Sequence, residues 1–104
     1  ARVLPDIVSA VNGRIPVLVD GGIRSGQDVF KMLALGANAV LVGRPLAIAA
    51  AGGEQTGVKF LLGKYRDDLF KCMNLCGVEN LSEIERKFLM PVRLQLEEVP
   101  DRKR

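Results

Sequence analysis

The chain has 104 residues and a formal net charge of +3, and 48% of its residues are hydrophobic while only 5% are aromatic. This length allows one small domain with an aliphatic core. Lysines and arginines are spread along the chain and form no basic stripe interleaved with aromatics, which argues against a nucleic-acid partner. No apolar run is long enough to cross a membrane, and the first ten residues, ARVLPDIVSA, lack the pattern of a signal peptide.

The first elements in chain order are a helix and a short strand. Apolar residues recur at helical spacing over 4–11, and Asn12-Gly13 is typical of a helix end. The apolar run 15–19 predicts a strand that ends at Asp20-Gly21-Gly22. Because this run does not alternate with polar residues, we expect a strand that is buried on both faces.

A second helix and strand follow the same order. The Ser25–Asp28 pattern predicts a capping box that opens a helix, and Gly36 is expected to close it. The run 39–42 predicts another buried strand. Such alternation predicts α/β architecture with a parallel sheet and right-handed crossovers. Two parallel strands do not make a stable sheet alone, so we expect the chain to be part of a larger fold.

The second half of the chain is predicted to be mainly helical. A small-residue segment leads to a loop over 54–57, and apolar spacing then predicts a long helix over 58–76. A capping pattern at 82–85 predicts a last short helix. We divide the chain into a segment of the larger fold at 1–90 and a C-terminal tail at 91–104.

Cys72 and Cys76 lie four residues apart on the long predicted helix, which places both thiols on one face. The sequence has no histidine and no second cysteine pair, so we expect structural thiols and no metal site. A reducing, cytoplasmic setting fits this interpretation.

The most informative residues follow the first strand. Asp20 stands at the carboxyl end of that strand, where parallel sheets bind ligands. Gly21 and Gly22 lack side chains that would keep a ligand from the backbone, and Arg24 offers a bidentate contact to phosphate. Ser25 is expected to cap the helix. The alternative is a plain turn in which Asp20 is the cap and Arg24 is solvated.

An equivalent turn, Gly43-Arg44-Pro45, follows the second strand. Its backbone N–H groups and the start of the next helix are suited to phosphate. Alone, it is equally consistent with a glycine turn and a surface arginine. Because adjacent parallel strands end at the same edge, we expect Arg24 and Arg44 to converge, and a dianion would relieve their repulsion.

Patterns that would indicate nucleotide binding or nucleophilic catalysis are missing. The segment 57–64 departs from a Walker A loop, GxGxxG is absent, and no nucleophile has a base beside it in the sequence. We therefore assign no catalytic residue to this chain.

The segment IPVLVDGGIRSGQDVFKMLALGANAVLVGRPLAIAAAGGEQTGV resembles the C-terminal part of the FMN-dependent α-hydroxy-acid oxidases and dehydrogenases, such as glycolate oxidase, lactate oxidase and flavocytochrome b2. The likeness covers about residues 1–88 and is strongest over 16–45, where DGG-I-R, DVFK-x-LALGA and GRP match. It implies a TIM (β/α)8 barrel of which this chain supplies strands seven and eight.

The resemblance also implies FMN as cofactor. By position, Asp20 would bond the ribityl chain, and the phosphate would lie against the rest of the two turns. The cofactor-binding residues implied in this way are Asp20, Gly21, Gly22, Ile23, Arg24, Gly43 and Arg44. The family oxidises L-2-hydroxy acids to 2-oxo acids while FMN is reduced.

In the family, the catalytic histidine and the carboxylate-binding arginine belong to a His-Gly-x-Arg motif shortly before the segment that residues 4–11 resemble. We expect both to lie outside this chain, which would then be inactive alone. The expected partners are a small 2-hydroxy acid in the full-length protein and further copies in a homo-oligomer, with no membrane and no nucleic acid.

Two alternatives remain open from the sequence. One is a different phosphate-binding barrel, of the IMP dehydrogenase, glutamate synthase or type 2 isopentenyl diphosphate isomerase type, which shares the glycine turn and the second strand. The other is a non-catalytic half-barrel that self-associates and captures a phosphorylated ligand.

Overall fold

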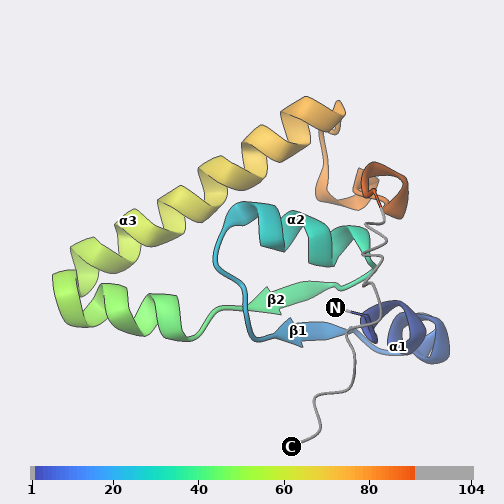
Figure 1. Ribbon diagram of the computed structural model, residues 1–104, viewed down its shortest axis with the longest axis horizontal. Coiled ribbons are helices and arrows are strands. Elements are labelled where there is room, and N and C mark those ends of the chain that lie inside the picture. Colours follow the sequence, from blue (N-terminus) through green and yellow to red (C-terminus); the bar gives the residue numbers. More distant parts are fainter. Residues whose placement is uncertain (1, 91–104) are drawn as a thin grey trace, which may run out of the picture.

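The computed structural model describes residues 2–90 (Figure 1). The elements in chain order are α1 (Leu4–Val11), β1 (Leu18–Asp20), α2 (Gly26–Ala34), β2 (Ala39–Leu41), α3 (Arg44–Cys76) and two short 3-10 helices, η1 (Leu81–Glu83) and η2 (Arg86–Phe88). The tail predicted at 91–104 lies outside the described residues. In the described part, no helix combines the length and the apolar character that crossing a membrane requires.

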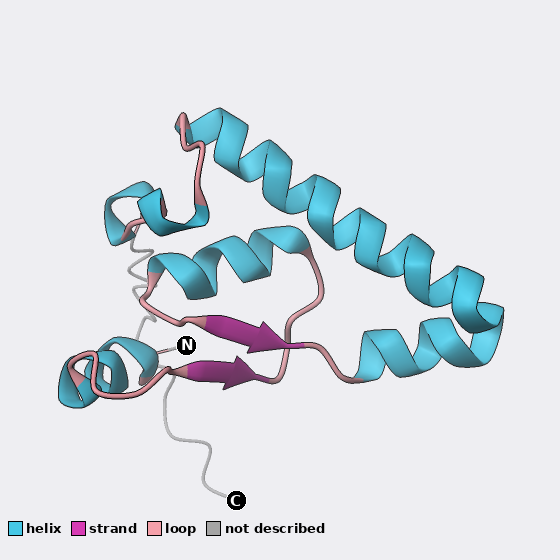
Figure 2. Cartoon of the chain, turned by 180° about the vertical axis from the view of Figure 1, so that it is seen from behind, coloured by secondary structure: helices cyan, strands magenta, loops and turns pink. Residues whose placement is uncertain are grey.

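The two strands pair in parallel, as the sequence predicts. Val19 is opposite Val40, and both arrows in Figure 2 point the same way. The predicted start of the first strand was too early, because the ladder begins at Leu18. Before it, the side chain of Asn38 accepts from Val17 N–H at 2.8 Å, and Asn38 N–H donates to Val17 O at 2.8 Å. At that point one of the two bonds between the segments therefore comes from a side chain.

The prediction that both strands are buried on both faces is wrong for the described chain. Leu18 is 57% exposed and Leu41 is 49% exposed. Val19 and Val40, which point to the opposite face, are half-buried. The sheet of the described residues has only two strands. The apolar side chains that the sequence provides for a sheet interior therefore remain uncovered on one face.

Helix α2 begins where it was predicted, but only half of the capping box forms, because the Asp28 carboxylate accepts from the N–H of Arg24 and not from that of Ser25. Ser25 is the N-cap, and its Oγ accepts from the N–H of Asp28 at 3.2 Å. At Gly26, α2 packs directly on α3. A Cβ atom there would collide with the backbone of Tyr65 and Leu69. Gly26 therefore allows the two helices to approach closely at the start of α2.

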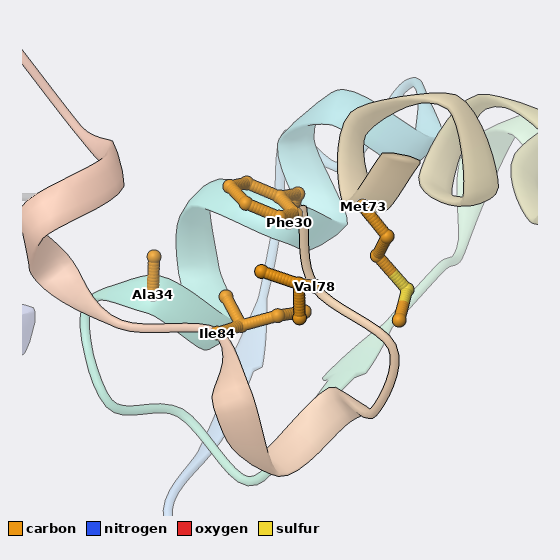
Figure 3. Close-up of a cluster of buried hydrophobic side chains, with 5 residues drawn as sticks. All are labelled: Phe30, Ala34, Met73, Val78 and Ile84. Carbon is orange, nitrogen blue, oxygen red and sulfur yellow. The ribbon is translucent and has the colours of Figure 1, made fainter. Parts of the chain in front are cut away.

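The hydrophobic core lies between α2, the second half of α3 and the segment after it (Figure 3). Its buried members are Phe30, Ala34, Met73, Val78 and Ile84. Cys72 and Cys76 pack against this cluster as unpaired, half-buried thiols. The core thus fixes the end of α3 and the middle of α2 relative to one another.

The predicted loop over 54–57 is wrong except at one residue. Only Glu54 leaves the helical region, with φ 50° and ψ −138°, and α3 continues on both sides of it. A Cβ on Gly57 would collide with the carbonyl oxygen of Ala49, so this glycine lets the two halves pack closely. A kink at one residue therefore replaces a loop, and α3 folds back in a V (Figure 1).

The short helix predicted from the 82–85 pattern is also wrong. Two 3-10 turns, η1 and η2, take its place, with Glu85 extended between them. The carboxylate of Glu83 accepts from Glu79 N–H at 3.0 Å and from Asn80 Nδ2 at 3.2 Å. Glu83 thus stabilises a local turn, and the extended Glu85 ends it before an α-helix can form.

Candidate phosphate-binding site

The loops that follow β1 and β2 open into one hollow, as their sequence predicts. The first loop contributes Asp20–Arg24 and the second contributes Gly43–Pro45 to its lining. Strand β2 adds Leu41, and the two halves of α3 add Ile48, Ala49 and Leu61. The hollow has a volume of about 820 Å³. All seven residues predicted to bind a cofactor therefore line a single site.

The first loop is shaped by two glycines in the left-handed region. Gly21 has φ 96° and Gly22 has φ 73°, conformations that other residues adopt only with strain. A Cβ at either position would meet no atom within 4 Å. Within residues 2–90, no acceptor outside the strand ladder takes a hydrogen bond from the N–H of Gly22 or Ile23. Successive N–H groups of this kind form the concave nests in which proteins bind anions.

The peptide group between Ile23 and Arg24 is held at both of its polar atoms. Its oxygen accepts from the hydroxyl of Tyr65 at 3.0 Å, and its N–H donates to Asp28 Oδ2 at 3.0 Å. The Arg24 N–H is therefore engaged within the chain, whereas the Arg24 side chain is exposed at the hollow. Ile23 contributes its backbone and is itself only 5% exposed.

The alternative in which Asp20 caps the helix is wrong, because Ser25 is the cap. Asp20 is instead exposed at the edge of the hollow. A carboxylate in that place can accept hydrogen bonds from hydroxyl groups of a ligand, which an engaged cap could not do.

The second loop is built differently. Gly43 is the N-cap of α3 and makes no side-chain capping bond, and Pro45 occupies the first turn of the helix. Gly43 O accepts from Ala47 N–H at 3.1 Å. The unbonded N–H groups at the start of α3 and the helix dipole make this end favourable for a negative group.

The charges at the hollow favour an anion. Arg24 and Arg44 carry two positive charges, and Asp20 carries one negative charge. Neither arginine forms an ion pair within the described residues, where the recorded ion pair joins Lys87 and Glu85. Two free guanidinium groups beside backbone N–H groups can bind a phosphate in bidentate fashion.

The part played by Tyr65 was not predicted from the sequence, where this residue is only one of the apolar positions of the helix predicted over 58–76. Burial raises the pKa of the Tyr65 hydroxyl, and the nearby carboxylate of Asp28 raises it further. A tyrosine on an otherwise aliphatic helix face indicates a buried hydrogen bond, because a buried hydroxyl needs a hydrogen-bond partner. The partner itself, 42 residues away in the sequence, could not be identified from the pattern.

Comparison with known proteins assigns the family. Residues 1–91 match the FMN-dependent dehydrogenase family. The chain belongs to this family. It is 43% identical over 99 residues to glycolate oxidase 1 of Zea mays, covering 95% of this chain and 27% of that protein. It is 48% identical to L-lactate oxidase of Nostoc sp., covering 83% of this chain and 24% of the relative.

Solved structures agree with this assignment. A mandelate oxidase variant that carries an FMN adduct superposes with a TM-score of 0.78 at 49% sequence identity, covering 82% of this chain and 26% of that one. The chain thus spans about a quarter of the length of the relatives that it matches. The family match confirms the resemblance from which we expected FMN as the cofactor.

The residues at the hollow fit the phosphate end of FMN. Gly43 has φ −105°, outside the left-handed region, and a Cβ there would meet nothing within 4 Å. Space beside the backbone is what a closely approaching ligand needs. With Gly22 and the two arginines, Gly43 forms a cradle that a side chain would fill.

Proposed function

We propose that this chain supplies the phosphate-binding part of the FMN site in an oxidoreductase acting on L-2-hydroxy acids. The observation that carries the proposal is the single hollow into which both glycine–arginine loops open. In this proposal Arg24 and Arg44 bind the phosphate oxygens, and the N–H groups of Gly22 and Gly43 complete the cradle. Asp20 accepts from the ribityl hydroxyls, while Gly21 and Ile23 contribute backbone to the same loop.

We further propose that β1 and β2 are strands seven and eight of a TIM barrel. The support is their parallel pairing, the crossover through α2 and the exposed Leu18 and Leu41. In such barrels the loops after strands seven and eight bind phosphate. Residues 1–90 would then be the barrel segment, and 91–104 a tail.

The substrate and the reaction are proposed from the family. When bound, FMN accepts the two electrons that leave a 2-hydroxy acid as it becomes a 2-oxo acid. Glycolate oxidase and lactate oxidase among the relatives favour this class over the other phosphate-binding barrels. The chain contributes binding and orientation. Because it has no histidine, it lacks the base that the resemblance implies, and we expect no turnover from it alone.

A small 2-hydroxy acid and a homo-oligomer are the partners that we propose for the whole protein. The cytoplasmic setting stays a prediction that the two unpaired thiols favour. Three of the plant relatives are named as peroxisomal oxidases, so the family is not confined to the cytoplasm.

The test compares FMN with riboflavin, which lacks the phosphate. We expect the chain to bind FMN at least about tenfold more tightly, because charge-assisted bonds to phosphate are the main difference between the two ligands. Quenching of flavin fluorescence measures both affinities. Equal affinities for the two flavins would overturn the proposal.

Charge reversal then assigns the phosphate contact to residues. Arg24→Glu and Arg44→Glu should each lower FMN affinity by about thirtyfold or more, because each replaces an attraction by a repulsion. Riboflavin affinity should change little. Arg86→Glu is the matched control, since Arg86 lies in η2 and is not among the residues that line the hollow. If all three variants bind FMN alike, the arginines have no contact with phosphate.

A further inference from the structure

Tyr65 joins two parts of the site that are far apart in the sequence. Its hydroxyl donates to Ile23 O at 3.0 Å, across 42 residues. Tyr65 is only 8% exposed, so this hydrogen bond is shielded from water. The second half of α3 is thereby attached to the loop after β1.

The same helix carries the other loop. Helix α3 starts at Arg44, in the second glycine–arginine turn, and its kink at Glu54 turns it back toward α2. Without that fold-back, Tyr65 would lie far along a straight helix, about 30 Å from Arg44 at the usual rise per residue. One helix therefore presents Arg44 at its beginning and holds the Arg24 loop by Tyr65.

The contact is directed at one peptide group. Tyr65 binds the oxygen of the Ile23–Arg24 peptide, and Asp28 binds its N–H at 3.0 Å. With both polar atoms fixed, rotation of this peptide is restrained. Its orientation sets the direction in which the backbone enters Arg24, and therefore where the Arg24 side chain starts. The close contact at Gly26 restrains the adjacent residues in the same way.

We propose that Tyr65 is a positioning residue that holds the Arg24 loop in the conformation that binds phosphate. The phosphate ligand in this inference rests on the proposed function. The restraint that Tyr65 places on the loop does not depend on it. Tyr65 is not among the residues that line the hollow, and its contact with the site is the hydrogen bond to the backbone of Ile23. It acts through the Ile23–Arg24 peptide.

The first experiment replaces Tyr65 by phenylalanine, which keeps the ring and removes the hydroxyl. We expect FMN affinity to fall about three- to tenfold and riboflavin affinity to stay within about twofold, because one buried hydrogen bond near the phosphate is lost. Met73→Leu is the matched control, a volume-conserving change in the core on the same helix. It should leave the ratio of the two affinities unchanged.

A second readout needs no ligand. Amide hydrogen exchange of Arg24 should accelerate at least about threefold in Tyr65→Phe, because its N–H belongs to the released peptide. If FMN and riboflavin bind the unaltered chain equally, the proposed function fails while this readout still decides the positioning role. If the chain prefers FMN and Tyr65→Phe preserves both that preference and Arg24 exchange, only the positioning role is overturned.

A double-mutant cycle distinguishes positioning of the loop from general destabilisation of the fold. Tyr65→Phe and Asp28→Ala should be non-additive in their effect on the FMN-to-riboflavin ratio, because both residues hold one peptide group. Strict additivity, or an equal loss of both flavins in Tyr65→Phe, would mean that Tyr65 supports the fold without positioning the loop.

Discussion

The two glycine–arginine loops look alike in sequence and are built in opposite ways. The loop after β1 depends on glycines at φ 96° and 73°, and on the hydrogen bonds that its Ile23–Arg24 peptide makes with Tyr65 and Asp28. The loop after β2 has a glycine at φ −105° and no side-chain cap. The first loop is fixed by its surroundings, whereas the second follows from the start of a helix.

The difference shows two ways to prepare an anion site. A nest of N–H groups needs an unusual backbone, and that backbone must be held in place by other groups. A helix start presents its N–H groups as a by-product of regular structure. The first loop should therefore be sensitive to substitutions that do not touch the ligand, and the second should be tolerant of them.

The largest effect on stability should come from Gly26→Ala, beside the first loop. The new Cβ would collide with the backbone of Tyr65 and Leu69, so α2 must move away from α3. We expect a loss of about 2–3 kcal/mol from overpacking. Thermal unfolding by circular dichroism should show a melting temperature lower by roughly 10 °C or more. Gly63→Ala, where a Cβ would meet nothing within 4 Å, is the control. A melting temperature equal to that of this control would show that the helices do not approach so closely.

A smaller effect should separate the two loops directly. Gly22→Ala places a side chain at φ 73°, which we expect to cost about 1–2 kcal/mol. Gly43→Ala, at φ −105°, should change the free energy of unfolding by less than about 0.5 kcal/mol. Urea unfolding measures both. Both variants should bind FMN more weakly, because the added methyl group occupies the cradle. Equal destabilisation by the two substitutions would contradict the contrast between the loops.

The smallest effect should appear at alkaline pH. The folded chain favours the neutral Tyr65 hydroxyl, because burial and then the Asp28 charge raise its pKa above 10.0. This contribution to stability is present below about pH 10 and is lost as pH rises through the higher pKa of the folded state. Burial also raises the pKa of Cys72, which acts in the same direction.

The comparison with Tyr65→Phe isolates the tyrosine. Urea unfolding from about pH 8 to about pH 11 should show a steeper loss for the unaltered chain than for the variant, because only the former has the phenol to titrate. Parallel losses in the two proteins would mean that the hydroxyl is not held in the neutral form.

Local signals in the sequence predicted much of this fold. The capping bond of Ser25 and the end of the first helix at Asn12 depend on neighbouring residues, and both are found where the sequence placed them. The meeting of Arg24 and Arg44 in one hollow followed from parallel pairing alone. Their contact with FMN stays a prediction.

Features that depend on distant contacts could not be predicted. Glycine and polar residues at 54–57 suggested a loop, but packing of the two halves of α3 leaves only Glu54 outside the helix. Tyr65 gave no sign of its partner at Ile23. The composition of the strands predicted burial because it suits a larger sheet. The described residues supply only two strands, so one face of these strands is exposed.

The parallel pair of strands has a consequence for how stability should be understood. Each strand has one paired neighbour in the described sheet, so the opposite edge of each offers backbone groups to another strand. A strand that binds such an edge recognises the folded chain and not the unfolded one. By mass action, the free energy of folding then depends on the concentration of that second strand. The stability of the folded chain then depends on binding of a second strand as well as on the sequence of the chain.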